Sequence, residues 1–175
     1  IKEMRILIAG GAGFIGSHLS KKLLEDGHTV ICIDNLITSN EKNLEDLSTN
    51  PNFSFIRHDI TKPLPEIEKI DRVYHLASPA SPNHHSPISY HKLAMETMLA
   101  NTTGTLHLLQ LAEKHSARFL FASTSEVYGD PLVNPQPETY LGNVSTTGPR
   151  AVYDEAKRFG ETLISYFIRE KNVDA

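Results

Sequence analysis

The sequence predicts an α/β protein with a Rossmann-type, doubly wound parallel sheet that carries helices on both faces. An apolar run at residues 4–9 leads directly into the glycine-rich segment 10–16, and a helical pattern follows it. Further apolar runs then alternate with helical segments, which is typical of parallel sheets. Asp34 ends the second apolar run at about the distance from the glycines at which dinucleotide-binding folds place an acidic residue.

The glycine-rich segment predicts a site for the pyrophosphate of a dinucleotide. Gly10 lets the chain turn sharply off the first strand, and Gly13 lets backbone amides approach the phosphates. Gly16 lets the following helix, expected over 17–26 and ended by Gly27, lie close to the sheet. The structural alternative is a glycine turn with an acidic helix cap, without a ligand.

Asp34 and Asn35 indicate which dinucleotide is bound. A carboxylate at Asp34 accepts hydrogen bonds from the adenosine ribose hydroxyls and repels a 2′-phosphate. Asn35, beside it, is not an arginine that could bind such a phosphate. The predicted cofactor is therefore NAD rather than NADP.

Composition restricts the classes of protein. The 175 residues are enough for a single domain over 1–175 with a hydrophobic core. A net charge of −4 argues against nucleic-acid binding and against an acidic membrane surface, and no apolar run is long enough to span a membrane. With no signal peptide before the first strand and one cysteine, Cys32, expected as a buried core thiol, we expect a cytoplasmic protein.

The remaining elements follow in order. The expected elements are strands at 29–33, 53–56, 72–76 and 117–122, a short helix around 41–47, one long helix from 88 to 115, and a last helix from 152 to 171. Asp59 and Ile60 come just after the third strand, where a doubly wound sheet places its ligand crevice, so we expect them to contact the adenine.

Two features of the second half leave alternatives open. His84, His85 and His91 lie in and after a proline-containing loop without the ligand spacing of a zinc site, so we predict a solvated loop and no metal. The apolar stripe of the 88–115 helix is wide enough for packing on the sheet and on a partner subunit. Simple core packing and a homodimer formed through the two long helices are equally supported at this point.

Tyr153 and Lys157 suggest the chemistry. Four residues apart on a helix, they share one face. The ammonium of Lys157 would lower the pKa of the phenol, and the positive nicotinamide of bound NAD would add to this. A phenolate can remove the proton from a sugar hydroxyl while hydride leaves the same carbon. Thr124, at the end of the fifth strand, can hydrogen-bond that oxygen and hold it.

The chain resembles the extended short-chain dehydrogenase/reductase family, and within it the UDP-glucuronate decarboxylases. The shared segments are GGAGFIGSH at 10–18, RHD at 57–59, HLASPASP at 75–82, ASTSEVYGDP at 122–131, GPR at 148–150, YDE at 153–155 and KR at 157–158. The resemblance covers nearly the whole chain but only about the first half of a typical member. It therefore implies that the family's C-terminal substrate-binding part is missing here.

The resemblance implies a reaction and a set of site residues. NAD⁺ would oxidise C4 of UDP-glucuronate, the resulting β-keto acid would lose CO₂, and return of the hydride would give UDP-xylose. Tyr153 would be the base, Lys157 its partner and ribose anchor, Thr124 the hydroxyl clamp, and Glu126 would act in ring distortion or proton handling. The expected cofactor residues are Gly10, Gly13, Phe14, Ile15, Gly16, Asp34, Asn35, Thr38, Asp59, Ile60, Leu76, Ala77, Ser78, Asn101, Ala122, Tyr153 and Lys157.

Two positions depart from the decarboxylase pattern and leave the sugar open. The decarboxylases have lysines where this chain has Leu99 and Glu113, and one of those lysines helps to hold the sugar nucleotide. The expected partner is a UDP-sugar. The alternatives are a sister 4-epimerase or 4,6-dehydratase, or an NAD-binding module without turnover.

Overall fold

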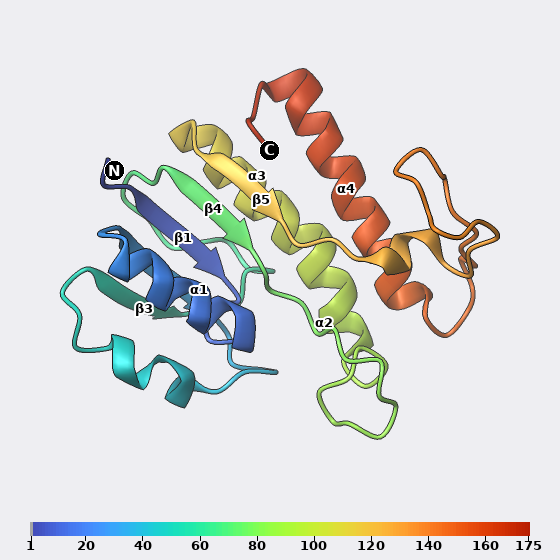
Figure 1. Ribbon diagram of the computed structural model, residues 1–175, viewed down its shortest axis with the longest axis horizontal. Coiled ribbons are helices and arrows are strands. Elements are labelled where there is room, and N and C mark those ends of the chain that lie inside the picture. The colour runs from blue at the N-terminus through green and yellow to red at the C-terminus, as the bar shows by residue number, and fades with distance from the viewer. Residues whose placement is uncertain (1) are drawn as a thin grey trace.

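The computed structural model describes residues 2–175 of the chain (Figure 1). Its strands are β1 (Arg5–Ala9), β2 (Thr29–Asp34), β3 (Phe53–Arg57), β4 (Arg72–His75) and β5 (Arg118–Phe121). Its α-helices are α1 (Phe14–Glu25), α2 (Ala94–Leu99), α3 (Thr105–His115) and α4 (Ala151–Lys171). Two 3₁₀ helices, η1 (Glu41–Leu47) and η3 (Ser125–Tyr128), and a π-helical turn, η2 (Ala100–Gly104), complete the elements.

All strand pairs are parallel, and the sheet order is β3-β2-β1-β4-β5. In the central register, Ile8 of β1 lies between Cys32 of β2 and Tyr74 of β4. After β3 the chain returns to the other side of β1 to form β4, which creates a topological switch point between β1 and β4. Ligands of such sheets bind outside the carboxyl ends of the strands at this point. The predicted fold class is confirmed.

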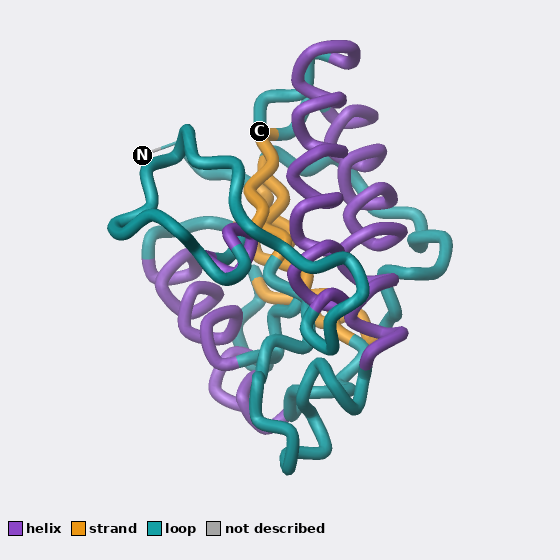
Figure 2. Tube along the Cα trace, turned by 90° about the vertical axis from the view of Figure 1, so that its right-hand side faces the viewer, coloured by secondary structure: helices purple, strands orange, loops and turns teal. Residues whose placement is uncertain are grey.

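Helices cover both faces of the sheet because side chains alternate along each buried strand. On β1, Ile6 and Ile8 belong to a core with α1 and η1, whereas Leu7 and Ala9 belong to a core with α3 and α4. Figure 2 shows the strands between these two groups of helices. Cys32 is fully buried in the first of these cores, as expected.

The helical run in the middle of the chain starts later than the sequence suggests. It begins at Ala94 instead of 88 and continues through α2, η2 and α3 to His115. Residues 88–93 form turns instead, because their backbone pairs with an earlier loop: the N–H of Tyr90 donates to the carbonyl oxygen of Ser81 at 3.1 Å, and Ser89 forms a β-bridge with Ser81. The prediction of a helix from 88 was therefore wrong at its start.

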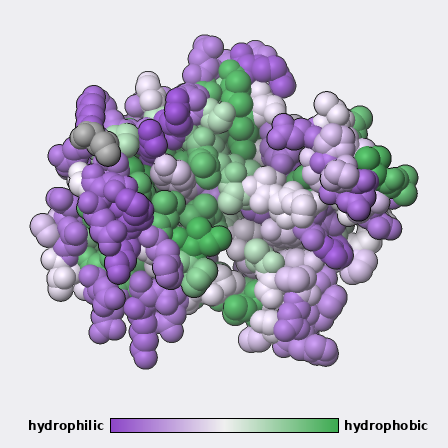
Figure 3. Space-filling model, viewed as in Figure 1, coloured by the Kyte–Doolittle hydropathy of each residue, from purple (hydrophilic) through white to green (hydrophobic). Residues whose placement is uncertain are grey.

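One part of the sheet carries no helix. Strand β5 pairs only with β4 among the described residues, and Leu120 on it is 45% exposed. Figure 3 shows hydrophobic side chains gathered in the middle of this face, over the sheet between α1 and α4. Among residues 2–175, no helix combines the length and the apolar character that crossing a membrane requires.

Candidate functional site

A cavity of about 610 Å³ lies at the carboxyl ends of the strands, on both sides of the switch point. Every residue that the sequence assigned to the cofactor, except Asn101, lines this cavity. These are Gly10, Gly13, Phe14, Ile15, Gly16, Asp34, Asn35, Thr38, Asp59, Ile60, Leu76, Ala77, Ser78, Ala122, Tyr153 and Lys157. The five strands thus bring residues from most of the chain to one place.

The three glycines of the first turn have different structural roles. Gly10 has φ +81°, and a Cβ there would lie 2.7 Å from the backbone nitrogen of Ala77. A Cβ on Gly16 would collide with the carbonyl oxygen of Gly10. A Cβ on Gly13 would meet only the Gly10 carbonyl oxygen, at 3.3 Å, and would otherwise project into the cavity that Gly13 lines. Gly13 therefore leaves open the space that a pyrophosphate needs.

The first turn of α1 suits an anion. No side chain caps it and it contains no acidic residue, so its backbone N–H groups and the helix dipole are available to a phosphate. Phe14 and Ile15 in this turn line the cavity while remaining 79% and 68% exposed. Together with the space beside Gly13, this turn fits the pyrophosphate of a dinucleotide.

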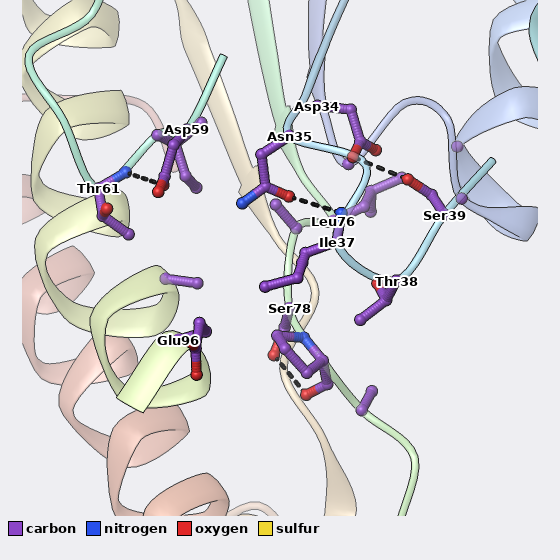
Figure 4. Close-up of a pocket in the computed structure, with 18 of the residues that line it drawn as sticks. Asp34, Asn35, Ile37, Thr38, Ser39, Asp59, Thr61, Leu76, Ser78 and Glu96 are labelled. Carbon is purple, nitrogen blue, oxygen red and sulfur yellow. Dashed lines mark hydrogen bonds between the residues drawn. The ribbon is translucent and has the colours of Figure 1, made fainter. Parts of the chain in front are cut away.

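Asp34 is held firmly at the end of β2 (Figure 4). One carboxylate oxygen accepts from the N–H of Ala12 at 3.0 Å, and the other accepts from the N–H of Leu36 and the hydroxyl of Ser39, both at 2.8 Å. An ionised carboxylate offers about four acceptor positions, so three donors leave capacity for a ribose hydroxyl. The arrangement fits the adenosine ribose of NAD.

The loops after β2 and β3 form the wall beyond Asp34. Asn35 accepts from the N–H of Ile37 at 3.1 Å, and Asp59 accepts from the N–H of Thr61 at 2.9 Å. Figure 4 shows these two loops facing each other across the cavity. Asp59 and Ile60 both line the cavity, and their contact with the adenine stays a prediction.

Lys157 lies at the other side of the switch point, where β5 ends. The side chain is 4% exposed, and its ammonium donates a hydrogen bond of 2.6 Å to the carbonyl oxygen of Ala122. The Nζ atom lies 4.5 Å from the ring centroid of Phe121 and 5.9 Å from that of Tyr153. Burial lowers the pKa of Lys157 to about 8.

The protonation of Tyr153 differs from the sequence expectation. Burial raises the pKa of its phenol, a hydrogen bond with Thr124 acts in the opposite direction, and the charge of Asp154 adds to the rise. The Lys157 ammonium donates to the Ala122 carbonyl oxygen and lies 5.9 Å from the centroid of the Tyr153 ring. In the protein without bound NAD, the phenol is therefore neutral near pH 7.

Thr124 and Glu126, which the sequence assigned to catalysis, do not line the cavity, although Ser123 beside Thr124 does. Thr124 is the N-cap of η3, and its hydroxyl accepts from the N–H of Glu126 at 3.2 Å. The carboxylate of Glu126 forms an ion pair with Arg150, just before α4. The pair connects the segment after β5 with the start of the helix that carries Tyr153.

Asn101 does not line the cavity, in contrast to the prediction. It is fully buried in the π-helical turn η2, where its amide donates to the hydroxyl of Ser78 at 2.8 Å and to the carbonyl oxygen of Thr97 at 2.9 Å. Ser78 does line the cavity, so Asn101 supports the wall from behind.

The structure also brings in residues that sequence reasoning did not assign. Ser39, His58, Ile88, Met95 and Glu96 line the cavity, and Tyr90 packs on Tyr153 behind it. Ser39 lies in the polar loop after Asp34, and this position next to the ribose-binding carboxylate could have indicated its place in the cavity. Nothing in the sequence around Tyr90 indicates that it packs on Tyr153. The rings of His84 and His91 stack at 3.6 Å, and residues 2–175 contain no group of three or more His, Cys, Asp or Glu that could hold a metal.

Comparison with known proteins supports this description. The sequence model of the NAD dependent epimerase/dehydratase family matches residues 6–175. UDP-glucuronic acid decarboxylase 1 of Xenopus tropicalis is 49% identical over 170 residues, which are 97% of this chain and 39% of that protein. UDP-glucuronic acid decarboxylase 3 of Arabidopsis thaliana is 49% identical over 173 residues, and the chain covers 48% of its length. The chain thus spans less than half the length of these relatives.

Solved structures share the fold. The UDP-glucose 4-epimerase of Thermotoga maritima with UDP-glucose aligns with a TM-score of 0.77 and 32% identity, over 97% of this chain and 53% of that one. The Bordetella bronchiseptica enzyme WbmG in complex with NAD aligns with a TM-score of 0.74 and 26% identity, over 94% of this chain and 50% of that one.

Proposed function

The chain belongs to the NAD-dependent epimerase/dehydratase family, and from this premise we propose that the protein carrying it decarboxylates UDP-glucuronate to UDP-xylose through a 4-keto sugar. The cofactor is NAD, and the glycine turn, the first turn of α1 and Asp34 are suited to hold it. Relatives of this chain are named UDP-glucuronic acid decarboxylases, which supports the choice of reaction.

The observation that carries the proposal is the position of Tyr153 and Lys157 in the cavity that also contains Asp34. Asp34 is the last residue of β2 and Ala122 follows β5, and these two strands lie on opposite sides of β1 in the sheet. A dinucleotide that lies across the switch point would have its adenosine near Asp34 and its nicotinamide near Lys157 and Tyr153. The arrangement would place the redox carbon beside a phenol and an ammonium.

The residues of this chain would handle the proton. Bound NAD⁺ supplies the acceptor for the hydride that leaves C4 of the sugar and returns it later. Tyr153 would take the proton of the C4 hydroxyl, and the hydrogen bond with Thr124 favours the phenolate that this requires. Lys157, oriented by the Ala122 carbonyl, would provide positive charge beside the ring. Burial raises the pKa of Tyr153. The positive nicotinamide ring of bound NAD⁺ would lower this pKa, in addition to the hydrogen bond with Thr124.

A sister 4-epimerase or 4,6-dehydratase is the second candidate, and Leu99 favours it. Leu99 lines the cavity. The resemblance to the decarboxylases implies a lysine at this position, and Leu99 would lack the positive charge that such a lysine offers to an acidic sugar nucleotide. Glu113, the other departure, does not line the cavity and forms an ion pair with Lys171 at 3.6 Å. Only Leu99 therefore bears on the choice of sugar.

We also propose that the protein is a homodimer through the long helices. Phe159 and Tyr166 are 49% and 45% exposed, and their spacing of two helical turns places them on one face of α4. Two such faces, with the run from α2 to α3, can pair as a four-helix bundle.

Product analysis after incubation with NAD⁺ and UDP-glucuronate tests the reaction. The experiment uses a protein that contains this chain and the remaining length found in the relatives. We expect CO₂ and UDP-xylose, and we expect Tyr153→Phe to abolish them while NAD binding is kept. Tyr140→Phe, the same change in the loop between η3 and α4, is the control. A 4-epimer or a deoxy-keto sugar from the corresponding UDP-hexose would favour the second candidate, and loss of NAD binding in Tyr153→Phe would contradict the role of the phenol as base.

A further inference from the structure

Tyr90 packs flat against Tyr153. The two ring centroids lie 4.8 Å apart with an angle of 6° between the ring planes, which is a parallel stack. Tyr90 is 1% exposed and Tyr153 is 6% exposed. One face of the Tyr153 ring is therefore covered by a residue from a different part of the chain.

Backbone hydrogen bonds to an earlier loop fix the position of Tyr90. The N–H of Tyr90 donates to Ser81, and the bridge between Ser81 and Ser89 closes the loop. The N–H of Leu93 then donates to the carbonyl oxygen of Ser89 at 2.9 Å, which leads into α2. Ser81 and Ile88 line the cavity, so the same loop forms part of its wall and supports the ring.

The hydroxyl of Tyr90 contributes no hydrogen bond. It is buried without a hydrogen-bond partner among the described residues. A buried hydroxyl without a partner lowers stability, so the hydroxyl does not account for the packing. The contact with Tyr153 is made by the ring.

We propose that Tyr90 is a positioning residue whose ring fixes the plane of Tyr153 and thereby the direction of its phenolic oxygen. The inference rests on the proposed role of Tyr153 as the base. A ring packed on one face cannot tilt toward that face, so the stack with Tyr90 removes the out-of-plane motion of the phenolic oxygen in that direction. Proton transfer depends on such alignment, and a small misplacement lowers the rate without changing how tightly the distant nucleotide is bound.

Fluorine NMR of this chain, labelled with fluorotyrosine, tests the stack without any substrate. The Tyr153 resonance is identified by its absence in Tyr153→Phe. We expect it to shift in Tyr90→Leu and Tyr90→Met, which lack the ring current of an aromatic neighbour, and to stay near its original position in Tyr90→Phe. An unchanged Tyr153 resonance in a folded Leu or Met variant would overturn the proposal.

Steady-state kinetics test whether the stack affects turnover. They use a protein that contains this chain and the remaining length found in the relatives. Tyr90→Leu should lower kcat at least about tenfold with KM changed less than about twofold, and Tyr90→Phe should restore kcat. Tyr140→Leu, in the loop between η3 and α4, serves as the control. A fall of kcat in Tyr90→Phe as large as in Tyr90→Leu would overturn the role given to the ring, and so would an unchanged kcat in a folded Tyr90→Leu. Absence of turnover in the parent would refute the proposed function instead, and the NMR comparison would still decide whether Tyr90 orients Tyr153.

Discussion

The ammonium of Lys157 donates a hydrogen bond of 2.6 Å to the carbonyl oxygen of Ala122 and so connects α4 with the end of β5. This contact brings a charged group into a nearly fully buried position, 4% exposed, next to the face of Phe121. No carboxylate pairs with the ammonium among the ion pairs of residues 2–175. Burying the charged Lys157 therefore lowers the stability of the folded chain, and this effect depends on pH because only the protonated side chain is charged.

Chain stability should rise with pH above 8 because of Lys157. Burial lowers its folded pKa to about 8 from 10.5, so between these values the unfolded chain binds more protons than the folded chain. From pH 7 to about 9.5 the free energy of unfolding should gain about 2 kcal/mol from this group. Urea unfolding across this range should show the gain in the parent and its absence in Lys157→Met. Equal pH dependence in both proteins would contradict the buried charge.

Gly13→Ala should separate cofactor binding from folding. Its Cβ would project into the cavity, so we expect NAD affinity to fall at least about tenfold, or about 1.4 kcal/mol. The free energy of unfolding should change by less than about 1 kcal/mol, because the residue is an N-cap with φ −73°. Gly16→Ala is the contrasting variant, because its Cβ collides with backbone and should destabilise the chain by about 1–3 kcal/mol. Titration calorimetry and urea unfolding measure the two effects, and unchanged NAD affinity in Gly13→Ala would argue against the pyrophosphate position.

Asp34→Ala combined with Asn35→Arg should lower the preference for NAD over NADP at least about tenfold, or about 1.4 kcal/mol. The substitutions remove the carboxylate that repels a 2′-phosphate and add a cation that can bind it. Asn35→Arg alone is the control, because it leaves Asp34 with its three donors. Equal binding of NAD and NADP by the parent chain would show that Asp34 does not select the cofactor.

Light scattering at micromolar concentration should give twice the mass of the chain. Phe159→Asp together with Tyr166→Asp should give the monomer mass, because two charges would enter the apolar contact between the α4 helices. Leu132→Asp, at a residue that is 82% exposed in the loop before α4, should leave the mass unchanged. A parent protein that scatters as a monomer would rule out this interface.

Local sequence was sufficient for the cofactor half of the site. The apolar runs that end at Gly10, Asp34 and Leu76 are buried strands, and parallel strands bring their carboxyl ends to one edge. Each of these residues lies at the end of its strand or directly after it, so its place at this edge of the sheet follows from where the strand ends. The cofactor and the fold class could therefore be predicted before any contact was known.

The sequence by itself determined the strands, the doubly wound class of the sheet and the spacing of Tyr153 and Lys157 on one helix face. Tertiary structure alone decided that the run before Ala94 forms turns, that Asn101 supports the wall from behind, and that Tyr90 stacks on Tyr153. These outcomes depend on burial and on backbone pairing between segments far apart in the chain, such as Ser81 with Ser89 and Lys157 with Ala122. Such pairings have no local periodicity, because they arise only when the packed sheet brings the segments together.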